Sequence, residues 1–517
     1  MRPVFTAAEM RNLDRRAIAE LAIPGGTLME EAGRGAAAAL MEMLPALGAP
    51  RNGARVAIVC GKGGNGGDGF VVARWLKRRG HHPEVLLAAR ADEIGGDAAS
   101  KLAALRRSGV RPIVVEDAIR AASRMADAHV VVDALLGTGA RGAPTGLTAA
   151  LIEGINASGR PVVALDIPSG LPADGGAPSG PAVRGTVTLT FAGLKYGLVT
   201  PPGPDFAGRV TVVPIGIPET ELARGIRLWL IERADVAARF PPRPRDAHKG
   251  TYGHLLIVGG SLGKTGAAAL AARAAMRAGA GLVTVATAAS QQPVVAGLVV
   301  ESMTEPLAET AVGSVALRAR ERVLELAGAR DAAAVGPGLG TDAETQDLAR
   351  GLAGALDRPL VLDADALTAL AARLELLRGA PAPRCLTPHP GEMARLLGVT
   401  IAEVQRDRVG AASGVATTYG VHVALKGATT VVAVPDGRAF LNPTGNPGMA
   451  SGGTGDALTG ILGALFARGM EATDAVVAAV YLHGLAGDLA AARLGEESLV
   501  AGDLVEALPD AFAALRG

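Results

Sequence analysis

The sequence is poor in several residue types, and each shortage excludes a class of protein. Its 517 residues include only two cysteines, Cys60 and Cys385, which give neither a disulfide framework nor a zinc-ligand pattern. Aromatic residues make up 3% of the chain and the formal net charge is +1, without a block of basic residues. A nucleic-acid surface built from basic patches or stacked rings is therefore not supported.

Long apolar runs are missing as well. No stretch approaches about 18 apolar residues without a glycine or a charge, so no membrane span is predicted. The first residues, MRPVFTAAEM, lack the apolar core of a signal peptide. We therefore expect a cytoplasmic protein that binds neither a membrane nor a nucleic acid.

Glycine and aliphatic residues are abundant, and the chain is too long for a single core, so two or more domains are expected. Thr6-x-x-Glu9 and Thr27-x-x-Glu30 both fit capping boxes at the start of helices. Short apolar runs then alternate with helix-prone stretches, which predicts a parallel sheet with helices on both faces and ligands at the carboxyl ends of the strands. The strands are predicted at 55–60, 84–88, 112–115, 129–134, 161–166 and 186–191.

The first glycine-rich stretch, residues 61–69, lies between a predicted strand and a helix predicted through 71–78. The spacing G-x-G-x-x-G from Gly61 to Gly66 is typical of dinucleotide binding by a redox domain. However, the next predicted strand has no acidic residue at its end to hold a ribose, and Asp68 adds a carboxylate that a pyrophosphate site has little use for. The redox interpretation is therefore disfavoured.

Polar side chains also follow two further strands of this predicted sheet. Asp133 and Asp166 each end a strand, and Ser169 follows in the segment DIPSG. An aspartate at a strand end more often caps a helix or turn. Together with Asn65, however, these residues bring oxygen ligands from three loops to one sheet edge, which suits a hard cation.

The segments NGGDG (65–69), DALLGTG (133–139) and DIPSG (166–170) resemble the NAD(P)H-hydrate epimerase family, over roughly residues 1–220. That family interconverts the two C6 epimers of hydrated, damaged nicotinamide cofactors. The resemblance implies a Rossmann-like αβα domain with a potassium ion at Asn65, Asp133 and Ser169. Asp166 is the expected proton-transferring carboxylate, with Asp68 second. The implied substrate contacts are Gly64, Asn65, Gly66, Gly67, Asp68, Gly137, Thr138, Gly139, Ala140, Arg141, Gly142, Ala143 and Asp166.

The domain boundary is predicted near residue 220, with a first domain over 1–220 and a second over 225–517. Proline-rich residues 240–245 are expected to be an ordered lead-in to the second domain. The segment from Gly259 through Gly263-Lys-Thr265 is one residue shorter than a Walker A loop, so we do not expect it to wrap a phosphate in that way.

The segment NPGMASGGTGDALTG (446–460) places Asp456 in a glycine-rich loop before a helix-prone apolar run, 457–466. The backbone N–H groups at such a helix start favour an anion. A carboxylate there is costly unless it does chemistry, such as taking a proton from a hydroxyl that attacks a phosphoryl group. A simple turn capped by an aspartate is the alternative.

Further polar segments follow other predicted strands of this half: GPGLG (336–340), DADAL (363–367), TPHPGE (387–392) and KGATT (426–430). His389 lies between two prolines in a loop, which favours a contact with a ligand over a place in the core. Lys426, with the hydroxyls of the same segment, suits the phosphates of a nucleotide.

Together with GGTGD (452–456), these segments resemble the NAD(P)H-hydrate dehydratase branch of the ribokinase-like fold, over most of residues 250–460. The resemblance implies that ADP, with ATP as the alternative, phosphorylates the C6 hydroxyl of the S-hydrate, and that phosphate then leaves. Asp456 would be the base, and phosphoryl transfer implies magnesium. The implied substrate contacts are Ala267, Gly338, His389 and Asp456, and the implied nucleotide contacts are Lys426, Gly427, Ala428, Thr429, Thr430 and Gly455.

The sequence thus predicts a bifunctional repair enzyme, an isomerase and lyase acting on the hydrates NADHX and NADPHX, and we expect a homo-oligomer. One alternative is a small-molecule kinase fused to a binding domain, which would accumulate a phosphorylated product. Another makes the front half a non-catalytic cofactor sensor, which would leave Asp68 and Asp166 without a purpose.

Overall fold

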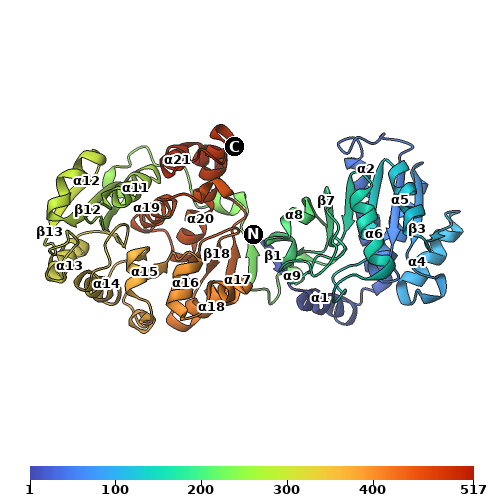
Figure 1. Cartoon of the computed structure of the whole chain (residues 1–517), viewed down its shortest axis with the longest axis horizontal. Coiled ribbons are helices and arrows are strands. Elements are labelled where there is room, and N and C mark those ends of the chain that lie inside the picture. Colours follow the sequence, from blue (N-terminus) through green and yellow to red (C-terminus); the bar gives the residue numbers. More distant parts are fainter. Residues whose placement is uncertain (517) are drawn as a thin grey trace. The chain divides into compact units, whose positions relative to one another are not determined.

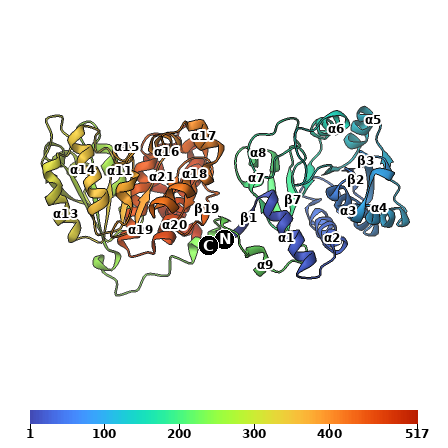
Figure 2. The same ribbon diagram turned by 90° about the horizontal axis from the view of Figure 1, so that it is seen from below.

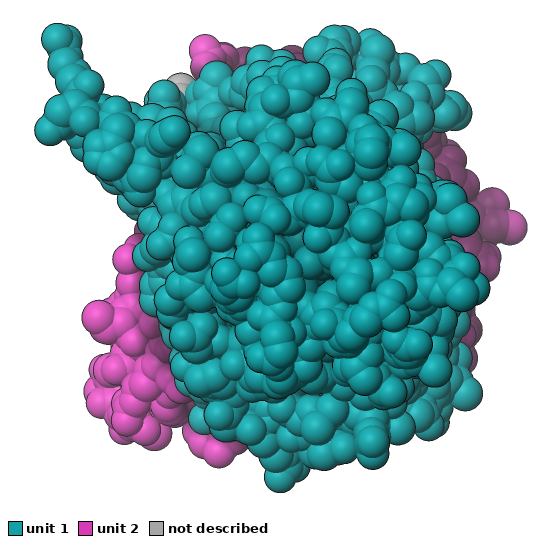
Figure 3. Space-filling view, turned by 90° about the vertical axis from the view of Figure 1, so that its left-hand side faces the viewer, with its two compact units in different colours: residues 1, 227–517 teal, residues 2–226 magenta. Residues whose placement is uncertain are grey.

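The structure is a computed structural model that describes residues 1–516, and it divides into two compact units (Figure 3). The front unit comprises Arg2–Ile226, and the rear unit comprises Met1 with the chain from Arg227 onward. This division falls a few residues after the boundary predicted near residue 220.

The front unit is built on a seven-stranded parallel sheet with the strand order β4-β3-β2-β5-β6-β7-β9. The strands between residues 55 and 191 lie where the sequence predicts them, to within a few residues. Their bounds are β2 (Arg55–Cys60), β3 (His82–Leu87), β4 (Ile113–Val114), β5 (Val130–Ala134), β6 (Val162–Leu165), β7 (Val187–Phe191) and β9 (Arg209–Val213). A short parallel pair, β1 (Arg2–Phe5) and β8 (Leu194–Lys195), completes the strands of the unit.

Helices cover both faces of this sheet (Figure 2). Along β2, Val56 and Ile58 pack into the cluster under α1 to α4, whereas Ala57 and Val59 pack against α5 and α6. Because neither face meets water, the strand is a continuous hydrophobic run. The helices are α1 (Ala7–Ala19), α2 (Gly25–Met43), α3 (Gly64–Arg78), α4 (Gly96–Arg107), α5 (Ala118–Asp127) and α6 (Gly146–Ala157), with the short α7 (Tyr196–Val199), α8 (Pro204–Ala207) and α9 (Glu219–Ala223) near the end.

One of the two predicted capping boxes is correct and the other is wrong. Thr6 and Glu9 exchange hydrogen bonds at the start of α1, 3.2 Å from Glu9 N to Thr6 Oγ1 and 2.7 Å from Thr6 N to Glu9 Oε2. Helix α2 instead begins at Gly25, directly after Pro24, so Thr27 already lies inside its first turn. Glu30 therefore does not cap; it accepts from Trp75 Nε1 of α3 at 3.1 Å and binds helix α2 to its neighbours.

Helix α3 starts at Gly64, earlier than predicted, so most of the glycine-rich stretch is its first two turns. The glycines permit a close approach of this helix to the strand ends. A Cβ on Gly66 would lie 1.9 Å from the carbonyl oxygen of Gly61, and one on Gly61 would lie 2.0 Å from that of Leu135. Packing of the helix against the strand ends therefore requires glycine at these positions, whether or not a ligand also approaches the backbone there.

The rear unit has a larger sheet in the order β13-β12-β11-β14-β15-β16-β17-β18-β19-β10. Its strands are parallel except that β18 runs antiparallel to both β17 and β19. The bounds are β10 (Leu228–Leu230), β11 (His254–Val258), β12 (Leu282–Ala288), β13 (Met303–Leu307), β14 (Ala332–Val335), β15 (Leu360–Leu362), β16 (Arg384–Leu386), β17 (His422–Leu425), β18 (Val431–Ala433) and β19 (Ala439–Leu441).

On one face of this sheet lie α11 (Thr265–Arg277), α19 (Thr454–Ala467), α20 (Ala472–Leu494) and α21 (Ala501–Arg516), which bury a large apolar cluster. Helices α14 (Ala343–Ala355), α16 (Pro390–Leu397) and α18 (Arg408–Tyr419) lie on the other side (Figure 1). The other rear helices are α10 (Arg233–Ala237), α12 (Gln292–Leu298), α13 (Arg320–Gly328), α15 (Asp365–Ala369) and α17 (Ile401–Arg406). Both units are thus three-layer α/β structures, as the predicted Rossmann-like and ribokinase-like classes require.

Helix α20 is a long apolar segment of the rear unit. It is the one helix among residues 1–516 that is long and apolar enough to cross a membrane, with a mean hydropathy of 1.5 over its most apolar window. However, 67% of that window is buried inside the rear unit. Its apolar surface is therefore used for the core.

Candidate active sites

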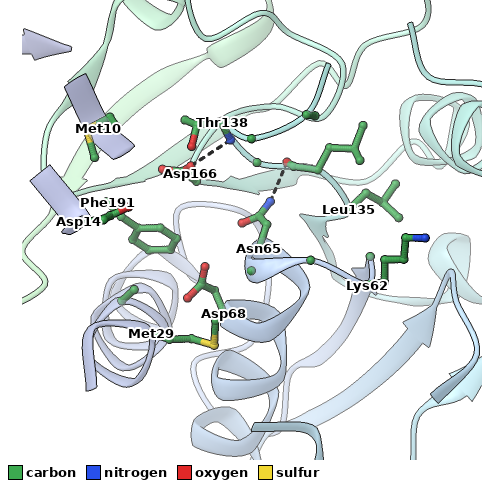
Figure 4. A pocket seen from close by; sticks show the side chains of 18 of the residues that line it. Met10, Asp14, Met29, Lys62, Asn65, Asp68, Leu135, Thr138, Asp166 and Phe191 are labelled. Carbon is green, nitrogen blue, oxygen red and sulfur yellow. Dashed lines mark hydrogen bonds between the residues drawn. The ribbon is translucent and has the colours of Figure 1, made fainter. Parts of the chain in front are cut away.

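The front unit has a cleft of about 830 Å³ at the carboxyl ends of its strands (Figure 4). The cleft is lined by many of the predicted substrate-binding residues: Gly64, Asn65, Asp68, Gly137, Thr138, Gly139, Ala140 and Asp166. The other predicted contacts do not line it. Gly66 and Gly67 are buried inside α3, Arg141 and Ala143 lie farther along their loop, and Gly142 lines a neighbouring cavity of about 100 Å³.

The three predicted cation ligands converge beside this cleft. Asn65 Nδ2 donates to the carbonyl of Leu136 at 2.8 Å, and Asn65 Oδ1 is buried without a hydrogen-bond partner among residues 1–516. Ser169 Oγ donates to the carboxylate of the fully buried Asp133 at 2.6 Å. Burial raises the pKa of Asp133 to about 6, although its hydrogen bonds from Ser169 and Leu135 oppose the rise.

An unpartnered buried carbonyl oxygen is costly unless a ligand occupies it. Here the amide oxygen of Asn65, the hydroxyl of Ser169 and the carboxylate of Asp133 together form a set of oxygen donors with a single formal negative charge. This donor set fits a hard monovalent cation such as potassium.

Asp166 follows the carboxyl end of β6 and lines the cleft. Its Oδ1 lies 2.5 Å from Lys195 Nζ, and its Oδ2 accepts from Thr138 N at 3.4 Å. The backbone of Asp166 has φ = 64°, a left-handed conformation that costs free energy in a residue other than glycine. Such strain is typical of positions where function fixes the direction of a side chain.

Two more carboxyl groups lie near this ion pair. Burial, and then the charge of Asp166, raises the pKa of Asp68 well above its ordinary value, and Lys195 opposes the rise. Asp14 of α1 also lines the cleft, and the surrounding protein and the charge of Asp166 raise its pKa too. Neither Asp14 nor Lys195 was identified from the sequence.

In the rear unit, Asp456 lies in the first turn of α19, which begins at Thr454, three residues before the predicted helical run. The turn before it contains Gly453, whose φ of 94° is in the region that favours glycine. Burial, and then the charge of Asp363, raises the pKa of Asp456 to about 7, although Lys426 opposes the rise. Its carboxylate makes no hydrogen bond within residues 1–516, so it is available to a substrate hydroxyl near neutral pH.

Lys426 and Asp363 lie beside Asp456 as an ion pair. Lys426 Nζ is 2.8 Å from Asp363 Oδ1, and Thr459 Oγ1 donates to Asp363 Oδ2 at 2.7 Å. Burial disfavours the Lys426 ammonium, but the carboxylates of Asp363 and Glu392 outweigh it and raise the pKa of Lys426. A Cβ on Gly455 would lie 3.1 Å from Lys426 Nζ, so these two predicted nucleotide contacts lie together.

The remaining residues of the predicted nucleotide segment, Gly427, Ala428, Thr429 and Thr430, form the loop between β17 and β18. Arg408 supports this loop from α18 by donating to the carbonyl oxygens of Leu425 at 3.1 Å and Lys426 at 3.2 Å. The loop is exposed at Gly427 and Ala428, whereas Thr429 and Thr430 are half-buried.

The predicted substrate contacts Ala267 and Gly338 are also brought together, since a Cβ on Gly338 would lie 3.2 Å from that of Ala267. Lys264, the lysine of the Walker-like segment, pairs with Asp365 at 3.2 Å, and Asp365 also accepts from Gly340 N at 2.9 Å. These contacts hold the loop through groups of the chain itself.

His389 has a structural contact that the sequence did not reveal. Its Nδ1 accepts from Gly391 N at 3.0 Å and from Glu392 N at 3.3 Å, so it caps α16. The side chain remains 51% exposed, with Nε2 3.5 Å from Glu392 Oε1. Capping fixes the ring while its other edge stays accessible.

These two sites define a two-domain α/β enzyme with a carboxyl-lined cleft in one unit and an acid in an anion-binding loop in the other. A family model described as YjeF-related protein N-terminus matches residues 25–197, and one described as NAD(P)H-hydrate dehydratase matches residues 255–510. The chain belongs to the family of bifunctional NAD(P)H-hydrate repair enzymes, as its identity to two full-length relatives shows.

The chain is 45% identical over 510 residues to the bifunctional NAD(P)H-hydrate repair enzyme Nnr of Moorella thermoacetica, covering 98% of this chain and 96% of that protein. It is 36% identical over 456 residues to the corresponding Escherichia coli enzyme, covering 87% and 84%. Among solved structures, an ADP/ATP-dependent NAD(P)H-hydrate dehydratase from Bacillus subtilis, co-crystallised with ATP and Mg²⁺, is 33% identical. That match covers 56% of this chain and 98% of the other, with a TM-score of 0.48.

Proposed function

We propose that the front unit interconverts the R- and S-hydrates of NADH and NADPH, and that the rear unit dehydrates the S-hydrate. In the rear reaction ADP phosphorylates the C6 hydroxyl, and the phosphate then leaves, so that AMP, phosphate and NAD(P)H are released. The observation that carries this proposal is Asp456, a carboxyl group with a pKa of about 7 inside a phosphate-type glycine turn.

In the rear unit, Asp456 takes the proton of the C6 hydroxyl as its oxygen attacks the terminal phosphoryl group of the nucleotide. The backbone N–H groups of residues 453–455 stabilise the charge of the transferring group. Lys426 and the 427–430 loop hold the nucleotide, while Ala267, Gly338 and His389 contact the hydrate.

In the front unit, Asp166 exchanges a proton with the C6 hydroxyl or with water, and Asp68 lies within the same cleft. The loop from Gly137 to Ala143 and the start of α3 hold the nucleotide part of the substrate. Asn65, Asp133 and Ser169 would hold potassium, which supplies a fixed positive charge beside the substrate phosphates. The unpartnered Asn65 Oδ1 supports this assignment.

Magnesium would be held mainly by the phosphates of the nucleotide. Among residues 1–516 no three acidic, histidine or cysteine side chains are grouped with metal-ligand geometry. Mg²⁺ commonly binds through one or two carboxylates and substrate phosphates. We further propose a cytoplasmic homo-oligomer with functional domains over 1–220 and 225–517.

An experiment that follows both steps tests the proposal. An R/S mixture of NADH-hydrate is supplied with Mg²⁺ and either ADP or ATP, and the absorbance of regenerated NADH is recorded. Recovery of both epimers with ADP supports the proposal, and no recovery with either nucleotide would refute it. A small-molecule kinase would instead accumulate a phosphorylated product, which phosphorus NMR detects.

A further inference from the structure

The front cleft contains a buried lysine that the proposed reaction does not yet use. Lys195 of β8 is fully buried, and its ammonium lies 2.5 Å from Asp166 Oδ1. It also donates to Thr190 Oγ1 at 2.9 Å and to the carbonyl of Phe191 at 2.7 Å. An ammonium has three hydrogens, and all three have partners here. Lys195 therefore has no donor left for a substrate and can act only through Asp166.

Asp14 is another polar group of the cleft that the proposed reaction does not use. It comes from α1, far from every predicted motif, and lines the cleft with Met10 and Phe191 (Figure 4). Its side chain is open to the cleft and makes no hydrogen bond to another residue within 1–516. Asp68, by contrast, is only 9% exposed. Asp14 can therefore reach a substrate hydroxyl and exchange its proton with water between turnovers, which a buried carboxyl group does more slowly.

We propose that Asp14 is the second proton-transferring residue of the front site, acting with Asp166, and that Lys195 positions Asp166 for the same reaction. This inference rests on the proposed epimerase function of the front unit. In this reaction Asp14 is the acid that protonates the leaving hydroxyl, and Asp166 is the base that deprotonates the incoming water.

The hydroxyl-bearing carbon C6 of the hydrate is bonded to the ring nitrogen N1. Asp14 gives its proton to the C6 hydroxyl as the C6–O bond breaks, water leaves, and the N1 lone pair forms an N1=C6 double bond. Asp166 takes a proton from a second water as its oxygen bonds to the opposite face of C6, and the double-bond electrons return to N1. One water leaves and one enters, and the proton gained by Asp166 returns to Asp14 through water in the cleft.

The charges around Asp166 suit this division. It faces the Lys195 ammonium from β8, the Thr138 N–H, Asp14 from α1 and Asp68 from α3. The Lys195 ammonium holds the Asp166 carboxylate in place, while the charge of Asp166, after burial, raises the pKa of Asp14. Asp14 is thereby biased towards the protonated form that an acid needs.

The test follows the R/S ratio by chromatography without any nucleotide, so that the rear unit does not contribute. Asp14→Asn should slow epimerisation by about 100-fold or more and remove the basic limb of the pH–rate profile. Glu20→Gln, at the exposed end of the same helix, is the matched control and should keep the wild-type rate.

Lys195→Met should lower kcat for epimerisation with little change in KM, because Asp166 loses the contact that orients it. Should Lys195→Met fail to fold, Thr190→Val removes one anchor of the ammonium but keeps its charge. It should then lower kcat by less, again with little change in KM. An unchanged kcat would refute the positioning role.

The outcomes separate this inference from the proposed function. Wild-type protein that does not epimerise at all would refute the proposed function. Two outcomes would refute only the role of Asp14, provided that the wild-type protein epimerises the hydrate. One is an Asp14→Asn epimerisation rate within about threefold of the wild-type rate. The other is loss of the basic limb of the pH–rate profile in Asp68→Asn instead of Asp14→Asn. In H₂¹⁸O the label should enter the C6 hydroxyl with each epimerisation, and retention of the original oxygen would refute the loss of water.

Discussion

Each unit of the protein places a lysine–aspartate pair beside its site, but the two pairs are oriented in opposite ways. In the front unit the lysine is the buried partner, with Lys195 0% and Asp166 14% exposed. In the rear unit the aspartate is the buried partner, with Asp363 1% and Lys426 20% exposed. A lysine–aspartate pair therefore presents a carboxylate to the front cleft, whereas the second pair presents an ammonium beside the glycine turn of the rear unit.

This reversal matches what each proposed reaction needs. Proton transfer at C6 requires a fixed carboxylate, and a buried lysine orients Asp166. Phosphoryl transfer requires a cation near the phosphates, and the buried Asp363 holds the Lys426 ammonium beside Asp456. In both cases the partner away from the substrate fixes the position of the partner that meets it.

The largest expected effect comes from Asp456→Asn. Removal of the base should reduce NADH formation from S-hydrate, ADP and Mg²⁺ by about 10³-fold, while epimerisation stays intact. Asp166→Asn should show the reverse pattern. Asp510→Asn, an exposed change on α21, should leave both activities unchanged. Near-normal dehydration by Asp456→Asn would show that another group is the base.

The second expected effect is on stability, and it tests which partner is buried. Asp166→Asn leaves the Lys195 ammonium without its carboxylate partner, and Lys426→Met leaves the Asp363 carboxylate without its cation. Each change should therefore lower the free energy of unfolding of its own unit by about 3 kcal/mol. Urea unfolding can be followed through Trp75 for the front unit and Trp229 for the rear unit, in single-tryptophan variants. Adding Lys195→Met to Asp166→Asn, or Asp363→Asn to Lys426→Met, should restore much of the loss. No recovery in the double variants would contradict the reversed orientation.

The third effect is a pH dependence of the dehydration reaction in the rear unit. Asp456 must be ionised to act as a base, and its pKa is raised to about 7, so kcat/KM for dehydration should fall as the pH drops below about 7. Asp363→Asn removes a charge that raises this pKa, and the acidic limb should move down by about one pH unit. Tm measured over the same pH range excludes unfolding as the cause. A limb that stays in place would mean that another group titrates.

The smallest effect concerns the cation site of the front unit. Potassium should raise the Tm of this unit by a few degrees relative to choline, because it binds only the folded state. Asn65→Ala removes the unpartnered oxygen and should abolish that rise. Asn52→Ala, an exposed asparagine of the front unit that does not line the cleft, is the control. An equal potassium effect in Asn65→Ala would place the ion elsewhere.

Much of both sites was predictable because their residues stand at the ends of successive parallel strands. Asn65, Asp133, Ser169 and Asp166 share one sheet edge, and alternation of strands and helices is enough to predict that they meet. Lys195 gave no such signal, since one lysine in a glycine-containing turn after β7 has no distinctive spacing.

Asp14 was missed for a different physical reason. On the amphipathic helix α1, a polar residue between apolar positions usually faces water, and only the packing of α1 over the cleft gives it another role. The wrong capping box at Thr27 has a similar origin. Its spacing was suitable, but Pro24 starts the helix earlier and Glu30 is attracted to Arg74, Trp75 and Lys101 on neighbouring helices.

The two cysteines have a practical consequence for chemical labelling. Cys60 lies in β2 and Cys385 in β16, both are fully buried, and burial raises the pKa of each thiol. Neither should form the thiolate that reacts with maleimides or oxidants. The native chain is thus already a background for site-specific labelling, in which one cysteine introduced on the surface of each unit would carry a dye pair without any prior removal of native thiols.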